Sequence, residues 1–177
     1  MNHTDHVNLI RKGITRSGGI WADIGSGDGA FTLALAELLG STGQIISVDR
    51  NGSALKSQQS KMKAQFPNVT VSYKVANYAN QLDLPPLDGI LMANSLHFCE
   101  AKKRLDVLEL MRTYLQPGGR FILVEYDTDK GNRWVPYPLS FHSWQAISQQ
   151  AGLINTTLLA TRPSRFLGQI YASVSTK

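Results

Sequence analysis

The sequence predicts an α/β protein of three layers, with helices on both faces of a mostly parallel sheet. Apolar runs typical of strands alternate with helical patterns along the chain. A glycine-rich turn at residues 25–29 joins the first buried strand to an apolar helix, and Asp49 ends the next strand twenty residues after Gly29. That arrangement is typical of nucleotide-binding α/β folds. With 177 residues, the chain is expected to form a single domain, residues 1–177.

The first half of the chain is predicted to alternate regularly between helix and strand. Val7 and Ile10 fall at helical spacing in an N-terminal segment, residues 1–18, which we expect to act as a cap. The helix after the glycine-rich turn is apolar on nearly every side, which predicts deep burial. The expected elements are a helix at 3–13, a strand at 20–24, a helix at 31–39, a strand at 44–49, a helix at 53–65 and a strand at 69–75.

The second half is predicted to continue the same alternation and to end on two strands. An amphipathic helix at 100–115 carries one apolar stripe, and Pro117-Gly118-Gly119 is expected to close it before a strand that reaches Tyr126. Residues 127–138 are irregular and rich in Asp, Gly and Pro, which suggests a lid loop. The remaining expected elements are a strand at 89–93, a helix at 140–152 and strands at 153–160 and 167–175.

The glycine-rich turn allows two interpretations. Gly25, Gly27 and Ala30 satisfy the loose G-x-G-x-x-A pattern of a dinucleotide site, so a nicotinamide-dependent oxidoreductase is one alternative. The turn also reads D-x-G-x-G-x-G from Asp23 to Gly29. A carboxylate beside a pyrophosphate would place like charges together, whereas a cationic amine would be attracted. The turn therefore favours an adenosine-containing ligand that carries an amine, such as S-adenosylmethionine.

On these residues the sequence resembles the class I S-adenosylmethionine-dependent methyltransferases. Beyond the turn at 21–32, residues 87–98 are similar to that family's fourth strand and following loop, and residues 115–126 to its L-x-P-G-G turn and fifth strand. The resemblance implies a Rossmann-like, seven-stranded sheet whose last strand is antiparallel and inserted between the fifth and sixth. It also implies transfer of a methyl group to a small molecule by in-line displacement. A catalytically silent binding protein that works with a partner stays an alternative.

The resemblance assigns cofactor contacts to the ends of the first, second and fourth strands and to the residues after the third. Asp49 is expected to accept hydrogen bonds from a ribose diol. Asp23 would hold the methionine amine, or alternatively bond the amides of its own loop. Arg50 would stack on the adenine or face solvent, and Asn77 stands where the family often has an acid. The predicted cofactor-binding residues are Asp23, Gly25, Ser26, Gly27, Gly29, Asp49, Arg50, Asn77, Tyr78 and Asn94.

Three residues near the predicted site could take part in the chemistry. His97 follows the fourth strand, and histidine is the side chain most often used as a base near neutral pH, so His97 is the candidate base, with a packing histidine as the alternative. Glu125 and Tyr126 end the fifth strand, where they would either bind substrate or simply terminate the strand. Trp134, in the expected lid, offers an aromatic surface to a substrate or else fills part of the core.

Composition limits the partners and the compartment. The net charge of +5 comes from basic residues that are scattered rather than clustered, which argues against nucleic acid as a partner. Cys99 is the sole cysteine, which excludes an internal disulfide. Without an apolar segment of membrane-spanning length or a secretory signal, the chain is expected to be cytoplasmic. We expect no metal ion, and a homodimer remains open.

Overall fold

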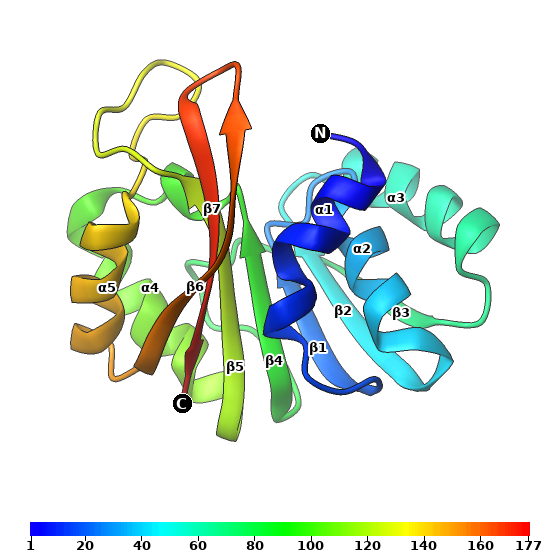
Figure 1. Ribbon diagram of the computed structural model, residues 1–177. Helices are drawn as coiled ribbons and strands as arrows, with labels where there is room; N and C mark the ends of the chain where they lie inside the picture. Colours follow the sequence, from blue (N-terminus) through cyan, green and yellow to red (C-terminus); the bar gives the residue numbers. More distant parts are fainter.

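The computed structural model describes all 177 residues and shows one sheet of seven strands between two layers of helices (Figure 1). The strand order is β3-β2-β1-β4-β5-β7-β6, and β7 runs antiparallel to both of its neighbours. The prediction that the last strand lies between the fifth and sixth is confirmed. The strands are β1 (Gly19–Ile24), β2 (Gly43–Asp49), β3 (Thr70–Val75), β4 (Leu87–Ala93), β5 (Leu115–Tyr126), β6 (Ile154–Ser164) and β7 (Gly168–Thr176).

The helices divide between the two faces of the sheet. One apolar core joins α1, α2 and α3 to the sheet, and a second core joins α4 and α5 to the opposite face. As predicted, α2 is deeply buried, because it lies between the sheet and α1, which packs beside it on the same face and also contacts β5, β6 and β7. The helices are α1 (His3–Ile10), α2 (Ala30–Leu39), α3 (Gly52–Gln65), α4 (Ala101–Tyr114) and α5 (Phe141–Gln150), with short 3₁₀ turns at 11–13, 40–42 and 96–98.

The Pro-Gly-Gly segment differs from its prediction as a turn that precedes a strand. Residues 117–119 lie inside β5, where Leu115 pairs with Leu87 and regular pairing resumes at Arg120. The extra residues form a bulge, for which the positive φ of Gly118 (76°) is suited. Backbone hydrogen bonds from this bulge to the C-terminal Lys177 hold the end of β7 in place.

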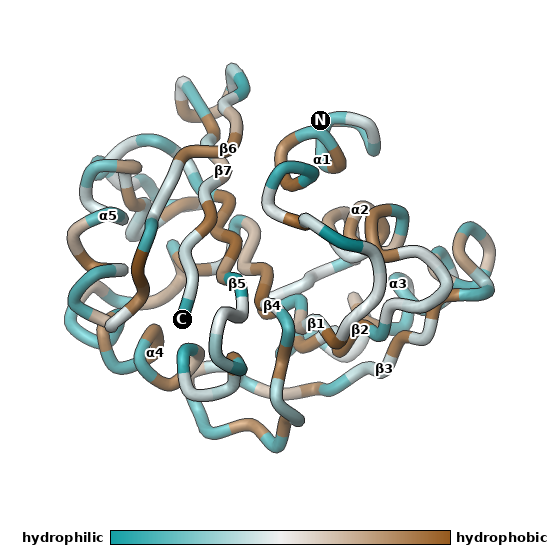
Figure 2. The backbone as a smooth tube through the Cα atoms, turned by 60° about the horizontal axis from the view of Figure 1, so that its bottom comes forward, coloured by the Kyte–Doolittle hydropathy of each residue, from teal (hydrophilic) through white to brown (hydrophobic).

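The parallel strands β1 to β4 all end at one edge of the sheet, where their polar loops meet. Figure 2 shows hydrophobic residues along β4, β5 and α2, whereas the turns at the ends of the sheet are largely hydrophilic. This edge is where ligands bind in open parallel sheets, because the strand order reverses there. No helix has the length and apolar character that crossing a membrane requires.

Candidate functional site

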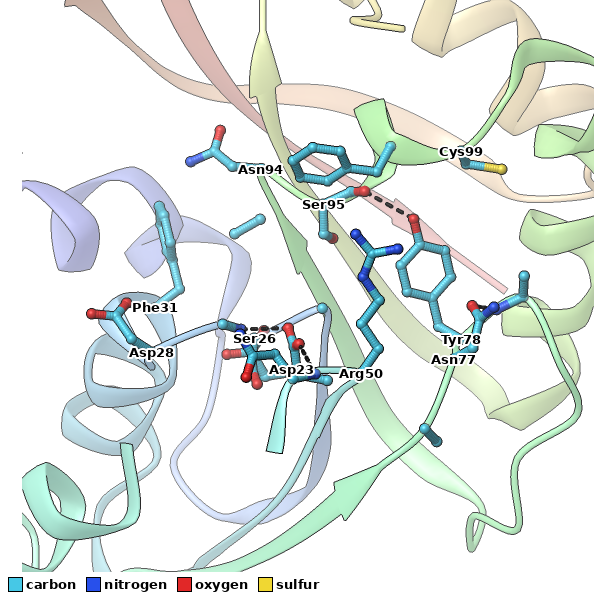
Figure 3. Close-up of a pocket in the computed structure, with 18 of the residues that line it drawn as sticks. Asp23, Ser26, Asp28, Phe31, Arg50, Asn77, Tyr78, Asn94, Ser95 and Cys99 are labelled. Carbon is cyan, nitrogen blue, oxygen red and sulfur yellow. Dashed lines mark hydrogen bonds between the residues drawn. The ribbon is translucent and has the colours of Figure 1, made fainter. Parts of the chain in front are cut away.

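A cavity of about 590 Å³ opens at the carboxyl ends of the parallel strands. Its walls come from the loops after β1, β2, β3 and β4, with one residue of α1, His6, at the rim. Figure 3 shows Asp28 and Phe31 on one side and Asn77 and Tyr78 on the other, with the Arg50 guanidinium between them. The volume lies within the range usual for small-molecule sites.

The structure brings nearly all of the predicted cofactor-binding residues to this cavity. Nine of them line it: Asp23, Gly25, Ser26, Gly27, Asp49, Arg50, Asn77, Tyr78 and Asn94. Gly29 is the exception, because it caps α2 behind the cavity wall with a φ of 90°. A Cβ at Gly29 would lie 2.3 Å from the Gln58 side chain, so this glycine makes room for a neighbour.

The carboxylate of Asp49 lies at the end of β2 and links two loops. Its Oδ2 accepts a hydrogen bond from the amide of Gly27 at 2.8 Å, and its Oδ1 accepts one from the amide of Asn51 at 2.8 Å. An ionised carboxylate can accept about four hydrogen bonds. Asp49 is therefore held in place and keeps acceptor capacity toward the cavity that it lines.

Asp23 is fully buried at the floor of the cavity and only half satisfied. Its Oδ2 accepts a hydrogen bond from the Thr32 hydroxyl at 2.5 Å, whereas its Oδ1 has no partner. Burial raises the pKa of Asp23 to about 7; the Thr32 hydrogen bond opposes this rise and the charge of Asp49 adds to it. A buried acceptor without a partner is unfavourable, so Asp23 is suited to a ligand that brings a donor.

Asn94 is a second buried acceptor on the same cavity. It follows β4 in a left-handed conformation with φ 51°, and its side-chain Oδ1 has no hydrogen-bond partner. The next residue, Ser95, packs against the glycine-rich turn so closely that a Cβ at Gly25 would lie 2.4 Å from the Ser95 Cβ. The loops after β1 and β4 thus approach each other at backbone distance, as a glycine allows.

Arg50, Asn77 and Tyr78 form the side of the cavity beyond Asp49. Arg50 projects into the cavity and takes part in no ion pair or hydrogen bond. The Tyr78 hydroxyl donates to the backbone carbonyl of Ser95 at 2.9 Å. The Asn77 Oδ1 accepts a hydrogen bond from the amide of Ala79 at 3.0 Å, so it already stabilises the turn in which Asn77 lies.

The three residues singled out for chemistry lie together, but none of them lines the cavity. The Nδ1 of His97 is 2.7 Å from Oε1 of Glu125, and the backbone amide of His97 donates to Oε2 at 3.0 Å. Both side chains are buried. The Tyr126 ring lies 6.0 Å from the His97 ring, and Phe98, next in the chain, lines the cavity. The pair therefore lies behind the cavity wall.

The segment 127–138 is tied down at both ends. Asp127 and Asp129 accept hydrogen bonds from the first residues around the start of α5, and the Tyr137 amide donates to the carbonyl of His97 at 3.0 Å. Trp134 is 69% exposed, so the alternative in which it fills the core is wrong. The aromatic surface of this segment instead faces solvent beside the residues that follow β4.

The sequence reasoning missed a buried polar network behind the glycine-rich turn. Gln58 on α3 is fully buried and joins Ser26, Ser47 and Thr32 through hydrogen bonds. The segment 53–65 was expected to be simply a polar helix. The only signal in the sequence was an uncharged polar residue three positions after Leu55, on the side of the helix that faces the sheet.

Comparisons with known proteins agree with this geometry. Residues 22–119 match the family model described as "Methyltransferase domain". The ubiquinone/menaquinone biosynthesis C-methyltransferase UbiE of Marinomonas sp. (strain MWYL1) is 34% identical over 121 residues, which cover 67% of this chain and 47% of that protein. The chain thus spans about half the length of the curated relatives it matches.

Solved structures show the same fold at low sequence identity. The YcgJ protein from Bacillus subtilis superposes with a TM-score of 0.75 at 16% identity and covers 99% of both chains. A Burkholderia thailandensis 1,6-didemethyltoxoflavin-N1-methyltransferase, with bound 1,6-didemethyltoxoflavin and S-adenosylhomocysteine, gives 0.76 at 15% identity, over 99% of this chain and 78% of that one.

Proposed function

The chain belongs to the methyltransferase-domain family, in its class I S-adenosylmethionine-dependent form, and from this premise we propose that it transfers a methyl group to a small-molecule acceptor. The observation that carries the proposal is the pair of buried, unpartnered oxygens, Asp23 Oδ1 and Asn94 Oδ1, on one cavity. Unpartnered acceptors of this kind suit a cationic amine, which donates hydrogen bonds. The pyrophosphate of a dinucleotide is anionic and would be repelled by an ionised Asp23.

The residues present fit S-adenosylmethionine. In the proposed complex, Asp49 accepts from the ribose hydroxyls, Asp23 and Asn94 from the amine, and Arg50 covers the adenine. The amides of Ala30 and Phe31, at the start of α2, have no backbone acceptor and lie on the cavity. The cofactor, when bound, would supply a methyl group for transfer to a nucleophile, and its positively charged sulfur would leave as a neutral thioether.

We propose that His97 accepts the proton of the acceptor, with Glu125 as its positioning residue; this role requires the wall at Phe98, which lies between the pair and the cavity, to open. An ionised Glu125 can only accept hydrogen bonds. It therefore accepts one from His97 Nδ1–H and another from the backbone amide of His97. The neutral ring then keeps its lone pair on Nε2, which makes it a base. In the proposed complex Tyr126, whose ring lies 6.0 Å from that of His97, contacts the acceptor. The alternative is that His97 only packs.

The acceptor proposed for this site is a ring compound. Phe98 lines the cavity and is 55% exposed, and Trp134, on the segment 127–138, is 69% exposed. The UbiE relatives carry names from ubiquinone and menaquinone biosynthesis, which supports an acceptor of quinol type. The proposed nucleophile needs alignment, exclusion of water and, if it carries a proton, a base.

Isothermal titration with S-adenosylhomocysteine tests the cofactor assignment. We expect micromolar binding by the wild-type protein and none by Asp49→Ala, while Asp106→Ala, at an exposed position on α4, should bind as the wild type does. Unchanged binding by Asp49→Ala would contradict the ribose assignment.

Labelled methyl transfer to a panel of quinols then tests the activity. His97→Gln should bind the cofactor normally and lose turnover. If His97→Gln keeps full turnover, His97 only packs; if the wild type binds cofactor and methylates nothing in the panel or in extracts, the protein is a silent binding partner.

A further inference from the structure

A continuous chain of hydrogen bonds connects the glycine-rich turn to Asp23 through the interior. The Ser26 and Ser47 hydroxyl oxygens are 2.7 Å apart, and Ser47 donates to Gln58 Oε1 at 2.9 Å. Gln58 Nε2 donates to the Thr32 hydroxyl oxygen at 2.5 Å, and that hydroxyl donates to Asp23 Oδ2 at 2.5 Å. The chain crosses β2, α3, α2 and β1, and Gln58 is its central member.

The direction of this chain follows from the chemistry of its ends. An ionised Asp23 can only accept, so the single hydrogen of the Thr32 hydroxyl must point to it. The Thr32 oxygen then needs a donor, which is the NH₂ end of the Gln58 amide. The carbonyl end of the same amide accepts from Ser47. Every hydrogen in the chain therefore points toward Asp23.

We propose that Gln58 is a positioning residue for the cofactor amine: its amide orients the Thr32 hydroxyl as a donor to Asp23. Asp23 is thereby held as an ionised acceptor, with Oδ1 left for the ligand. The proposal rests on the proposed function, because it takes the cofactor to be S-adenosylmethionine. It explains why a fully buried polar side chain stands on the sheet-facing side of α3.

Position 58 requires an amide side chain. A carboxamide offers a donor and an acceptor at fixed ends, whereas a carboxylate of the same shape offers acceptors only. A carboxylate at position 58 would draw the Thr32 hydrogen to itself, and Asp23 would need a proton in order to keep its bond. Gly29 supports the same assignment, because the absence of its Cβ leaves the space that the Gln58 side chain fills.

Apart from Thr32, the groups around Asp23 either favour its protonated form or make no contact with it. Burial and the Asp49 carboxylate, at the end of β2, both raise the pKa of Asp23. His6 from α1 has a pKa lowered mainly by burial, and Asp28 and Arg50 line the cavity from the two neighbouring loops. Asp23 takes part in no ion pair, so the Thr32 hydrogen bond is what favours its ionised form.

The decisive variant is Gln58→Glu, with Gln59→Glu as its matched control. Gln59 is exposed on the same helix and receives the same change of charge. Carbon-13 NMR of the Asp23 carboxyl in the protein without cofactor measures its pKa directly. Titration calorimetry with S-adenosylhomocysteine from pH 6 to pH 8.5 measures the affinity at each pH.

We expect Gln58→Glu to raise the pKa of Asp23 by at least one unit and to weaken binding at pH 7 by tenfold or more, with recovery at higher pH. Gln59→Glu should stay within twofold of the wild type. A folded Gln58→Glu protein with an unchanged Asp23 titration overturns the proposal.

A second variant covers the case in which Gln58→Glu does not fold. Thr32→Val removes the donor to Asp23 with little change in shape, and we expect the same upward movement of the Asp23 pKa. An unchanged titration in Thr32→Val also overturns the proposal. Wild-type protein that fails to bind S-adenosylhomocysteine overturns the proposed function instead, and the NMR titration separates the two failures.

Discussion

Replacing Asp23 with asparagine should change protein stability in a way that depends on pH. The folded pKa of about 7 lies above the value near 3.9 of an unfolded aspartate. Below about pH 4 both states hold the proton, so Asp23 then carries no penalty. Between about pH 4 and pH 7 only the unfolded chain loses the proton, so the stability of the wild type falls. Above about pH 7 the penalty is complete.

The magnitude follows from the difference between the two states. About three pH units correspond to about 4 kcal/mol of unfolding free energy that the wild type loses between pH 4 and pH 8. The asparagine amide places a donor where Oδ1 has no partner, which costs about 1–3 kcal/mol at every pH. Asp23→Asn should therefore be less stable than the wild type at pH 4 and more stable, by about 1–3 kcal/mol, at pH 8.

Urea denaturation of both proteins without cofactor at pH 4, 6 and 8 measures this difference. Asp106→Asn, at an exposed position on α4, is the control and should differ little from the wild type at any of these values. An equal stability difference between Asp23→Asn and wild type at pH 4 and pH 8 would show that the pKa of Asp23 is not raised in the folded protein. The stabilised variant should also lose at least tenfold in affinity for S-adenosylhomocysteine, because it lacks the charge that attracts the amine.

Three further variants test other parts of the site. Gly25→Ala should abolish S-adenosylhomocysteine binding in calorimetry and lower the unfolding free energy by about 2–4 kcal/mol. The alanine would be strained by its φ of 74°, and its Cβ would also clash with the Ser95 Cβ, 2.4 Å away. Trp134→Ala should leave stability within about 0.5 kcal/mol, because the side chain is 69% exposed, and raise the KM for the acceptor; a large loss of stability in urea would contradict this. Glu125→Gln should cost about 1–3 kcal/mol in thermal or urea denaturation, because the amide oxygen can replace only one of the two carboxylate oxygens that accept from His97. An unchanged midpoint would argue that these hydrogen bonds are not formed in solution.

The parts of the fold that the sequence predicts are those that depend on local patterns. The buried run that contains Asp23, the glycines after it and the apolar helix that follows are adjacent in the chain, so the local sequence pattern alone places them. The same is true of Asp49, because a strand that is buried almost throughout leads directly to it. The Pro-Gly-Gly segment was predicted less well, since its place inside β5 depends on pairing with β4 and on contacts with Lys177.

The parts that could not be predicted depend on contacts between distant segments. Gln58 reads as one more polar residue on a polar helix, and only the packing of α3 on β2 and α2 turns it inward. His97 and Glu125 are 28 residues apart, and neither neighbourhood indicates that their side chains meet in the interior. Gly29 was predicted to line the cofactor, but its requirement for glycine comes from its φ of 90° and from the nearby Gln58 side chain.

Two features that cost the protein stability lie on one cavity, and their coincidence supports this site independently of any motif. Asp23 is a buried carboxyl with one oxygen unpartnered, and Asn94 combines a left-handed backbone with a second unpartnered oxygen. Both line the same cavity, although Asp23 lies on β1 and Asn94 follows β4. A sequence keeps such unfavourable groups where a ligand compensates for them. A ligand that satisfies both oxygens should therefore stabilise the protein more as the pH rises through 7, because Asp23 is then increasingly ionised.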